Sequence, residues 1–340
     1  MNSVLHIMIA DKKFNIPLME WMINEEVFKN HKFLVLTTKE FQLKNSNQII
    51  TLESPYRKNI ISNLYKFFKE VNSGDVIILH ALPLTQLLFL LPHKWRHTSW
   101  VINGSDLYNS EKKITHVFWK KLMISNFKSH LTHIEGDSIL ANKVFDANAV
   151  FKYSPMYLSN TVNTNLFNQV SKKNNFVILV GNSLSVTNNH LYIFQQLSRH
   201  QDKIDKIICP VNYGLESNYK LEVIEMGKFY FKEKFQPILD FLPRSEYESI
   251  LADVDIAVFD HWRQEAMGVT LMLLSLGKTV YVNKKTTSYE SFLNRGFRIF
   301  DNHLIFENGP MIQDVTANKI LIEKYYSIEK LKESLLSLND

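Results

Sequence analysis

The chain has 340 residues, of which 45% are hydrophobic and 21% are charged, and its formal net charge is +5 at pH 7. This is the composition of a globular protein, and the length exceeds what one hydrophobic core usually needs, so two domains are expected. The mild positive charge falls short of a basic nucleic-acid-binding surface, and no nucleic-acid partner is expected. The single cysteine, Cys209, excludes a disulfide framework and a cluster of thiolate metal ligands.

The first half of the chain alternates short apolar runs with segments of helical spacing. The apolar runs predict strands over residues 4–9, 33–37, 49–52, 75–80 and 98–102. The helical spacing predicts helices over 17–28, 60–71 and 85–91. This alternation is typical of an open sheet with helices on both faces.

The same alternation returns after an Asn-rich polar stretch over 160–175. Strands are predicted over 176–180, 206–210, 256–259 and 279–282, an extended piece at 238–239, and helices over 191–198, 219–231, 244–252 and 267–276. The predicted fold class is therefore α/β, with two Rossmann-like domains that face each other across a cleft. We expect a first domain over 1–160, a second over 171–320, and a terminal segment over 321–340 whose helix packs back on the first domain.

The stretch FVILVGNSLSVTNNH, residues 176–190, is the sharpest local signal. Its apolar run ends at Gly181, and helix-capping residue types, Asn188 among them, precede the next helical pattern. A strand, a glycine turn and a helix amino-terminus form an anion site, because backbone N–H groups and the helix dipole favour negative charge. Gly181, Asn182 and Ser183 are thus candidates for binding a diphosphate. An ordinary turn between a strand and a helix fits the same residues.

A second strand end carries the string DHWRQEAMG, residues 260–268. The guanidinium of Arg263 suits a phosphate, and Gly268 in the first helical turn lets a ligand approach the backbone. The alternative is that Arg263 and Glu265 only cap or solvate the start of the helix. Tyr213 follows the strand over 206–210 and is a candidate for contacting a base or a diphosphate.

Polar residues also follow the predicted strands of the first half of the chain, namely Asp11, His80, Asp106 and Asp137. The carboxyl ends of parallel strands meet at one edge of a sheet, so we expect these side chains to share a rim. A hydroxyl that accepts a transferred group needs hydrogen-bond acceptors there, and sometimes a base. For each residue taken singly, the alternative is a turn or capping role, or a core role for His80.

The sequence predicts neither a metal site nor a membrane span. It contains no HExxH string, and its closest carboxylate pair, Asp253 and Asp255, precedes a strand. The longest apolar run, 81–91, is too short to span a bilayer, and the first residues form a strand rather than a signal peptide. We expect a cytoplasmic protein, soluble or peripheral on the inner face of a membrane. The segment 112–128 fits a basic amphipathic helix on an anionic membrane, or a core helix with a Lys-bearing outer face.

Four strings resemble motifs of glycosyltransferase family 56, namely WVINGSDLY (100–108), ILVGNSLSVTNNH (178–190), CPVNYG (209–214) and RQEAMG (263–268). The resemblance extends over most of the chain. It implies a GT-B fold and a hexosyltransferase that retains the anomeric configuration and uses no metal or other cofactor. It also implies a dTDP-linked deoxy- or amino-deoxy-sugar donor and an undecaprenyl-diphosphate-linked acceptor at the cytoplasmic face of the inner membrane. The expected pathway is synthesis of O-antigen or enterobacterial common antigen.

The chain departs from the family's RQQGIG string at Glu265 and Ala266, which leaves the identity of the sugar open. In a glycosyltransferase, Glu265 and Tyr213 are expected to seat the nucleoside, and Asp106 is the first choice for the acceptor hydroxyl. The catalytic candidates are Asp106, Asp137, Asp11 and His80. The donor-binding candidates are Gly181, Asn182, Ser183, Asn188, Tyr213, Arg263, Gln264, Glu265 and Gly268. Two other interpretations stay open: a nucleotide-sugar epimerase of the same architecture, and a sugar-nucleotide-binding protein without catalysis.

Overall fold

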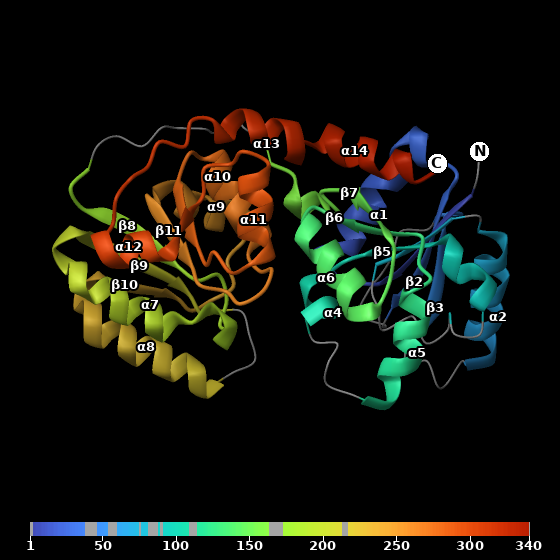
Figure 1. The fold of residues 1–340 in the computed structure, drawn as a ribbon, viewed down its shortest axis with the longest axis horizontal. Helices are drawn as coiled ribbons and strands as arrows, with labels where there is room; N and C mark the ends of the chain where they lie inside the picture. The colour runs from blue at the N-terminus through green and yellow to red at the C-terminus, as the bar shows by residue number, and fades with distance from the viewer. Residues whose placement is uncertain are drawn as a thin grey trace. The chain divides into compact units, whose positions relative to one another are not determined.

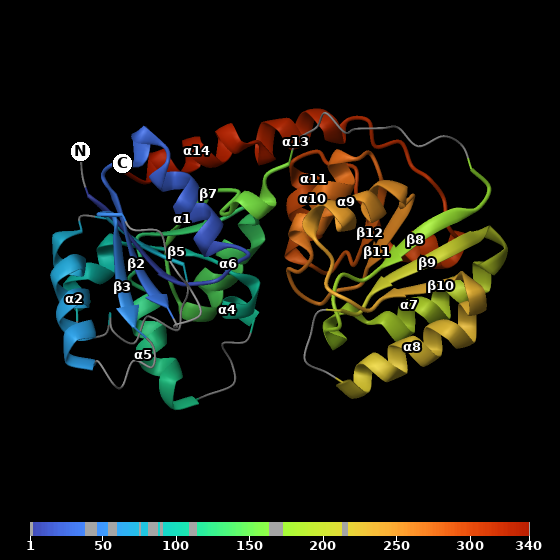
Figure 2. The ribbon, with the colours of Figure 1, turned by 180° about the vertical axis from the view of Figure 1, so that it is seen from behind.

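The computed structural model describes residues 3–37, 46–53, 60–74, 76–80, 88, 91–108, 114–162, 173–212 and 217–339. The chain forms two compact units, each a parallel sheet with helices on both faces (Figures 1 and 2). Unit 1 contains Met1–Thr161 and Ile328–Asp340, and unit 2 contains Val162–Ser327. The terminal segment expected over 321–340 thus divides at Ile328, where the chain returns to unit 1.

The sheet of unit 1 has seven strands in the order β3-β2-β1-β4-β5-β6-β7, and every neighbouring pair is parallel. The strands are β1 (Val4–Ile9), β2 (His31–Thr37), β3 (Ile49–Glu53), β4 (Val76–Leu79), β5 (Thr98–Val101), β6 (Ser129–Thr132) and β7 (Val150–Tyr153). The α-helices of this unit are α1 (Asn15–Ile23), α2 (Ile60–Ser73), α4 (Gly104–Tyr108), α5 (Ile114–Ile124), α6 (Glu135–Phe145) and α14 (Ile328–Leu336).

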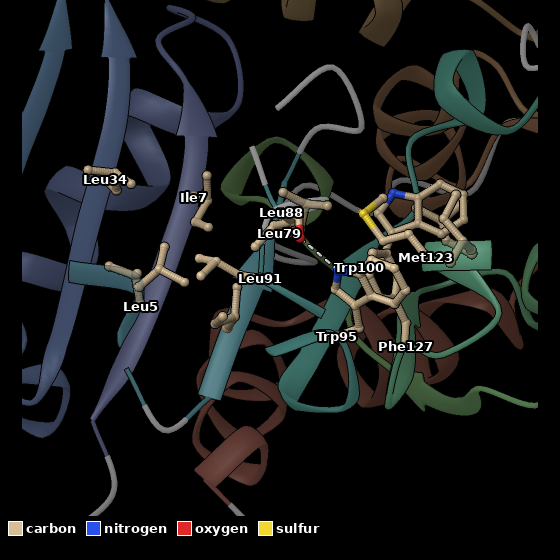
Figure 3. Packing of buried hydrophobic residues seen from close by; sticks show 14 of the residues in the cluster. Leu5, Ile7, Leu34, Leu79, Leu88, Leu91, Trp95, Trp100, Met123 and Phe127 are labelled. Carbon is tan, nitrogen blue, oxygen red and sulfur yellow. Dashed lines mark hydrogen bonds between the residues drawn. The ribbon is translucent and has the colours of Figure 1, made fainter. Parts of the chain in front are cut away.

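Side chains alternate along each strand of unit 1 and build a separate core on each face of its sheet. On one face, Leu5 and Ile7 of β1 pack with residues of α2, α5 and α6 (Figure 3). Trp95 closes that core, and its indole N–H donates to the carbonyl oxygen of Leu88 at 2.7 Å. On the other face, residues such as Met8 pack with apolar residues of α1 and α14. Both faces are therefore covered, as parallel sheets require.

The sheet of unit 2 has six strands in the order β10-β9-β8-β11-β12-β13, again all parallel. The strands are β8 (Phe176–Val180), β9 (Ile204–Pro210), β10 (Phe235–Ile238), β11 (Ile256–Phe259), β12 (Thr279–Val282) and β13 (Phe300–Asp301). The α-helices are α7 (His190–Leu197), α8 (Ser217–Phe231), α9 (Arg244–Asp253), α10 (Met267–Ser275), α11 (Thr287–Asn294), α12 (Asn302–Asn308) and α13 (Asn318–Tyr326). One face carries the core shared with α7, α8 and α12, and α10 packs against α13.

Each sheet contains one point where the strand order reverses direction. In unit 1 the chain moves outward from β1 through β2 to β3, then resumes on the other side of β1 with β4. In unit 2 the same reversal lies between β8 and β11. Ligands of open parallel sheets bind beyond the carboxyl ends of the strands at such a switch point. Two places on the chain thus qualify as binding sites on topology alone.

Most predicted elements are confirmed within a few residues. The strands over 4–9, 176–180, 256–259 and 279–282 have the predicted bounds. The predicted helix over 17–28 is two elements, α1 and a 3₁₀ turn at Glu26–Phe28. The predicted helix over 85–91 lies largely outside the described residues.

The last α-helix of the chain, α14, packs on unit 1. Leu331 and Leu335 of α14 belong to the core on the α1 face of unit 1. Lys332 pairs with Glu25 at 2.5 Å, and the hydroxyls of Ser334 and Ser154 lie 2.9 Å apart. The helix is therefore part of unit 1, although it follows unit 2 in the chain.

Candidate active site

The first candidate site lies at the switch point of unit 2 and begins with the loop after β8. Gly181 has a φ of +68°, a conformation that L side chains rarely adopt. A Cβ atom at this position would lie 2.4 Å from Nε2 of His190 and 3.0 Å from Oδ1 of Asn188. Only glycine therefore fits where the backbone leaves the strand.

Asn188 is fully buried, and its side chain holds this loop by hydrogen bonds. Its Oδ1 accepts the backbone N–H of Asn182 at 2.9 Å, and its Nδ2 donates to the hydroxyl of Ser183 at 3.1 Å. Because these contacts occupy the side chain, Asn188 shapes the loop and acts on any ligand through it. Of the predicted donor-binding residues, Asn182 and Ser183 belong to the loop that Asn188 holds in place.

His261 directly follows Asp260 after β11, and its side chain joins this loop to the loop after β8. Its Nε2 lies 3.1 Å from Oδ1 of Asn182 and 3.0 Å from Oδ1 of Asn188. Since Oδ1 of Asn188 already accepts a backbone N–H, Nε2 of His261 must be the donor, which leaves Nδ1 without a proton. Burial, aided by the nearby Arg263, lowers the pKa of His261 to about 3, so the ring stays neutral.

The neighbouring residue Asp260 forms hydrogen bonds with side chains from three further loops. Its carboxylate accepts side-chain N–H groups from Asn189 at 2.6 Å, Asn283 at 2.9 Å and Asn302 at 3.0 Å. These residues follow β8, β12 and β13. The carboxylate therefore fixes the loops at the carboxyl edge relative to one another.

The loop from β11 to α10 contains the predicted residues Arg263, Glu265 and Gly268. Nε of Arg263 donates to Oε1 of Glu265 at 2.5 Å, and the hydroxyl of Thr187 donates to the same carboxylate at 2.8 Å. Glu265 thus joins the loop after β8 to the loop after β11. Gly268 is the second residue of α10, and Ala266 before it has a φ of 58°. A narrow pocket beside this loop is lined by His261, Glu265, Met267, Thr270 and Asn283.

The structure modifies part of the predicted donor set. The helix that was predicted over 191–198 is α7, which begins at His190, behind a 3₁₀ turn at Val186–Asn188 that Ser185 caps. A second helix, α10, begins at Met267, directly after the loop that carries His261 and Glu265. Gln264 lies partly buried in the β11–α10 loop, and Tyr213 lies outside the described residues.

The second candidate site lies along the carboxyl edge of unit 1. Asp11 follows β1, and its carboxylate accepts the backbone N–H groups of Lys13, Phe14 and Asn15 at 3.0, 2.6 and 3.1 Å. It therefore organises the start of α1, which is the capping alternative considered for it from sequence. His80 follows β4 at the switch point and is buried.

Asp106 and Asp137 occupy the same edge beyond β5 and β6. Asp106 lies in the first turn of α4 and Asp137 in the first turn of α6. The hydroxyl of Tyr108 donates to Oδ1 of Asp137 at 3.0 Å, so α4 and α6 are linked at this rim. Asp137 is fully buried, whereas Asp106 is partly exposed.

Tyr157 is a member of this rim that the sequence did not reveal. Its ring centroid lies 6.1 Å from that of His80. Burial raises its pKa, and the negative charges of Asp106 and Asp11 raise it further. Met156, which precedes it, has a φ of 73°, a strained conformation for a non-glycine residue. No local pattern predicts such a turn, so the residue was not found from sequence.

The described residues contain neither a metal cluster nor a membrane span. In the part of the chain that the structure describes, no group of three or more His, Cys, Asp or Glu side chains is arranged to hold a metal ion. Within the same residues, no helix is long and apolar enough to cross a bilayer.

The two Rossmann-like units have the GT-B fold, and solved structures share that fold. HepE of Anabaena in complex with UDP and glucose is 13% identical with a TM-score of 0.71 over 100% of both chains. A glycosyltransferase from Rickettsia africae is 13% identical with a TM-score of 0.62 over 100% of this chain and 98% of that one. Sucrose-phosphate synthase from Thermosynechococcus elongatus is 8% identical with a TM-score of 0.68 over 98% of each chain.

The family described as 4-alpha-L-fucosyltransferase glycosyl transferase group 56 matches residues 1–308. The chain belongs to this family, as its motifs indicated, and it is a glycosyltransferase.

Proposed function

We propose that this enzyme transfers a deoxy- or amino-deoxy sugar from a dTDP-linked donor to an undecaprenyl-diphosphate-linked saccharide during assembly of O-antigen or enterobacterial common antigen. Membership of group 56 supports the transfer reaction. The observation that carries the proposal is the hydrogen-bonded loop network at the switch point of unit 2. HepE, which shares the fold, has been solved with UDP and glucose.

In this proposal unit 2 holds the donor. The amino-terminus of α10 offers backbone N–H groups and a positive dipole end to the diphosphate, with Gly268 allowing close approach. The loop at Gly181, Asn182 and Ser183 follows β8, which is the neighbour of β11, and lies at the same carboxyl edge of the sheet. Arg263, already oriented by Glu265, adds positive charge. Backbone groups and Arg263 then replace a metal ion, which the proposal does not require.

The acceptor occupies the carboxyl edge of unit 1. Asp106, His80 and Tyr157 offer hydrogen-bonding groups to a sugar hydroxyl there. Asp11 and Asp137 support this rim through the contacts that start α1 and tie α4 to α6.

Helix α5 supports a membrane-bound acceptor. Its inner face places Met123 and Ile124 in the core, yet Phe118, Trp119 and Leu122 on its outer face are 67%, 57% and 40% exposed. A helix that merely covers a core carries polar residues on its outer face. Exposed aromatic residues next to lysines are typical of a helix that lies on an anionic membrane surface.

Flotation with anionic vesicles tests the membrane part of the proposal. The double replacement Phe118→Ser and Trp119→Ser should abolish co-flotation with vesicles that contain phosphatidylglycerol. Replacement of Phe229, which is 72% exposed on α8 of unit 2, by Ser is the matched control and should leave flotation unchanged. Equal flotation of all three proteins would contradict a role for α5.

Incubation of the purified protein with dTDP-, UDP- and GDP-sugars and bacterial membranes tests the reaction. The proposal predicts radiolabel transfer from a dTDP-sugar into the lipid fraction. An altered free nucleotide sugar without lipid labelling would identify an epimerase. Nucleotide binding without any turnover would identify a binding protein, and either result would contradict the proposal.

A further inference from the structure

Trp262 is an exposed tryptophan at the carboxyl edge of the sheet of unit 2. Its side chain is 66% exposed, although tryptophan is one of the most buried residue types on average. The structure describes all five tryptophans of the chain, and of the others Trp95 and Trp100 are buried and Trp21 is half-buried. Only Trp119 is comparably exposed, and the proposed function places it on a membrane surface. The exposure of Trp262 is therefore a feature that the core of unit 2 does not explain.

The backbone that carries Trp262 is anchored on both sides. Asp260 and His261 directly precede it, are 6% and 5% exposed, and bind side chains from the loops after β8, β12 and β13. Arg263 directly follows it and pairs with Glu265. The indole is thus presented to solvent from a fixed segment at the switch point, which is where open parallel sheets bind their ligands.

The indole of Trp262 forms no interaction of its own within the part of the chain that the structure describes. It stacks on no other ring there, and its N–H has no hydrogen-bond partner. It is also the one exposed aromatic ring in the two segments 181–189 and 260–266, because His261 is buried. The other side chains of these segments are polar or aliphatic. An aromatic ligand that binds at this edge would therefore find its matching surface on Trp262.

A nucleotide-linked sugar contains three chemically different parts. The diphosphate needs N–H groups and positive charge, and in the proposed function the start of α10 and Arg263 provide them. The sugar needs hydrogen-bonding groups for its polar substituents. The base is the only aromatic ring of the donor, and its face binds best to another aromatic face. Among the described residues of these segments, Trp262 alone offers such a face.

We propose that the indole of Trp262 stacks on the thymine base of the dTDP-linked donor, which makes Trp262 a donor-binding residue. This inference rests on the proposed function, from which it takes the donor. The diphosphate then binds at Arg263 and α10, and the base binds at the residue just before Arg263 in the same loop. The base is common to the donor and to the product dTDP, so the contact stabilises both. Trp262 therefore affects the KM of the donor and leaves kcat unchanged.

Calorimetric titration of dTDP into matched variants tests the stacking. Trp262→Ala should weaken dTDP binding by about 5-fold to 100-fold, the usual effect of removing an aromatic partner of a base. Trp262→Phe should restore most of the affinity, because phenylalanine keeps an aromatic face. Phe229→Ala removes an aromatic ring that is 72% exposed on α8 and should bind dTDP like the parent. Equal affinity in Trp262→Ala and the parent would overturn the proposal.

Displacement of dTDP by inorganic pyrophosphate separates the base from the diphosphate. Pyrophosphate contains no base, so its inhibition constant should be the same in the parent and in Trp262→Ala. A weaker effect of pyrophosphate on the variant would show that the substitution disturbs the phosphate site, which would overturn stacking as the cause. A higher KM for the dTDP-sugar together with parental affinity for dTDP would place the indole on the hexose and would also overturn the proposal.

Tryptophan fluorescence tests the proposal even if Trp262→Ala fails to fold. Binding of dTDP should quench the emission of the parent protein, because the base covers an exposed indole. Trp262→Phe should bind dTDP in calorimetry but lose most of this quenching, and undiminished quenching would count against the proposal. Binding of dTDP by the parent that Trp262→Ala leaves unchanged refutes this inference alone. Absence of dTDP binding and of sugar transfer by the parent refutes the proposed function with it.

Discussion

At the scale of single residues, the donor loop depends on a backbone conformation that only glycine adopts without strain. Gly181→Ala should destabilise unit 2 and weaken dTDP binding, because the new methyl group meets His190 and Asn188. We expect a loss of about 1–3 kcal/mol beyond the strain of a positive φ, as overpacked sites show. Urea unfolding and calorimetric titration measure the two effects.

Gly296→Ala is the matched control for that variant. Gly296 also has a positive φ, +84°, but a Cβ atom there has only Leu321 near it, at 3.9 Å. This variant should lose about 1 kcal/mol from backbone strain alone and bind dTDP normally. Equal losses in the two variants would show that the contacts of Gly181 with His190 and Asn188 do not matter.

Ala266 presents the opposite case, a side chain in a conformation that favours glycine. The family's glycine-rich string differs from this chain at this position. Ala266→Gly should raise the free energy of unfolding by up to about 1 kcal/mol, because relief of the strained φ exceeds the added freedom of the unfolded chain. Thermal denaturation of the two proteins provides the measurement. A lower melting temperature in the variant would show that the methyl group of Ala266 makes contacts worth more than the strain.

At the scale of secondary-structure elements, α14 is the segment whose position depends most on its buried side chains. Leu331→Ala should destabilise unit 1 by about 2–5 kcal/mol, since Leu331 is fully buried in the core with α1. Ile328→Ala on the same helix removes a side chain that is 40% exposed and should cost much less. Hydrogen exchange of unit 1 reports the difference. Comparable exchange in the two variants would contradict the packing of α14 on this unit.

The elements were predictable where a local pattern alone determines them. The apolar run Phe176–Val180 and its terminal glycine identify β8 and its turn without any tertiary information. The three amides that bind Asp260 come from loops far apart in the sequence, so no local pattern reveals that contact. The left-handed Met156 and the rim position of Tyr157 likewise depend on tertiary packing. The rim residues of both units were found because polar side chains directly follow apolar strands.

At the scale of the whole molecule, buried neutral histidines make stability depend on pH. The unfolded chain binds protons below a pH of about 6.5, the ordinary pKa of histidine. His31 in the folded protein takes up a proton only near its lowered pKa of about 4, and His80 only near about 3. This contribution to stability is therefore complete above pH 6.5 and is lost as the pH falls toward 4.

Urea unfolding at pH 7.5 and at pH 5 should reveal that loss. A single histidine shifted as far as His31 contributes about 2 kcal/mol less at pH 5 than at neutral pH. His31→Gln should flatten the dependence on pH, because glutamine does not titrate. Equal stability of the parent at both pH values would contradict neutral burial of these rings.

Calorimetric titration of dTDP into the purified protein in the presence of EDTA tests the central claim most directly. The claim is that backbone groups at the switch point of unit 2 bind a nucleoside diphosphate without a metal ion. We predict saturable binding that EDTA does not change and that Gly181→Ala weakens at least about tenfold, or about 1.4 kcal/mol. Binding that appears only when Mg²⁺ or Mn²⁺ is added, or that is equal in Gly181→Ala and the parent, would contradict the claim.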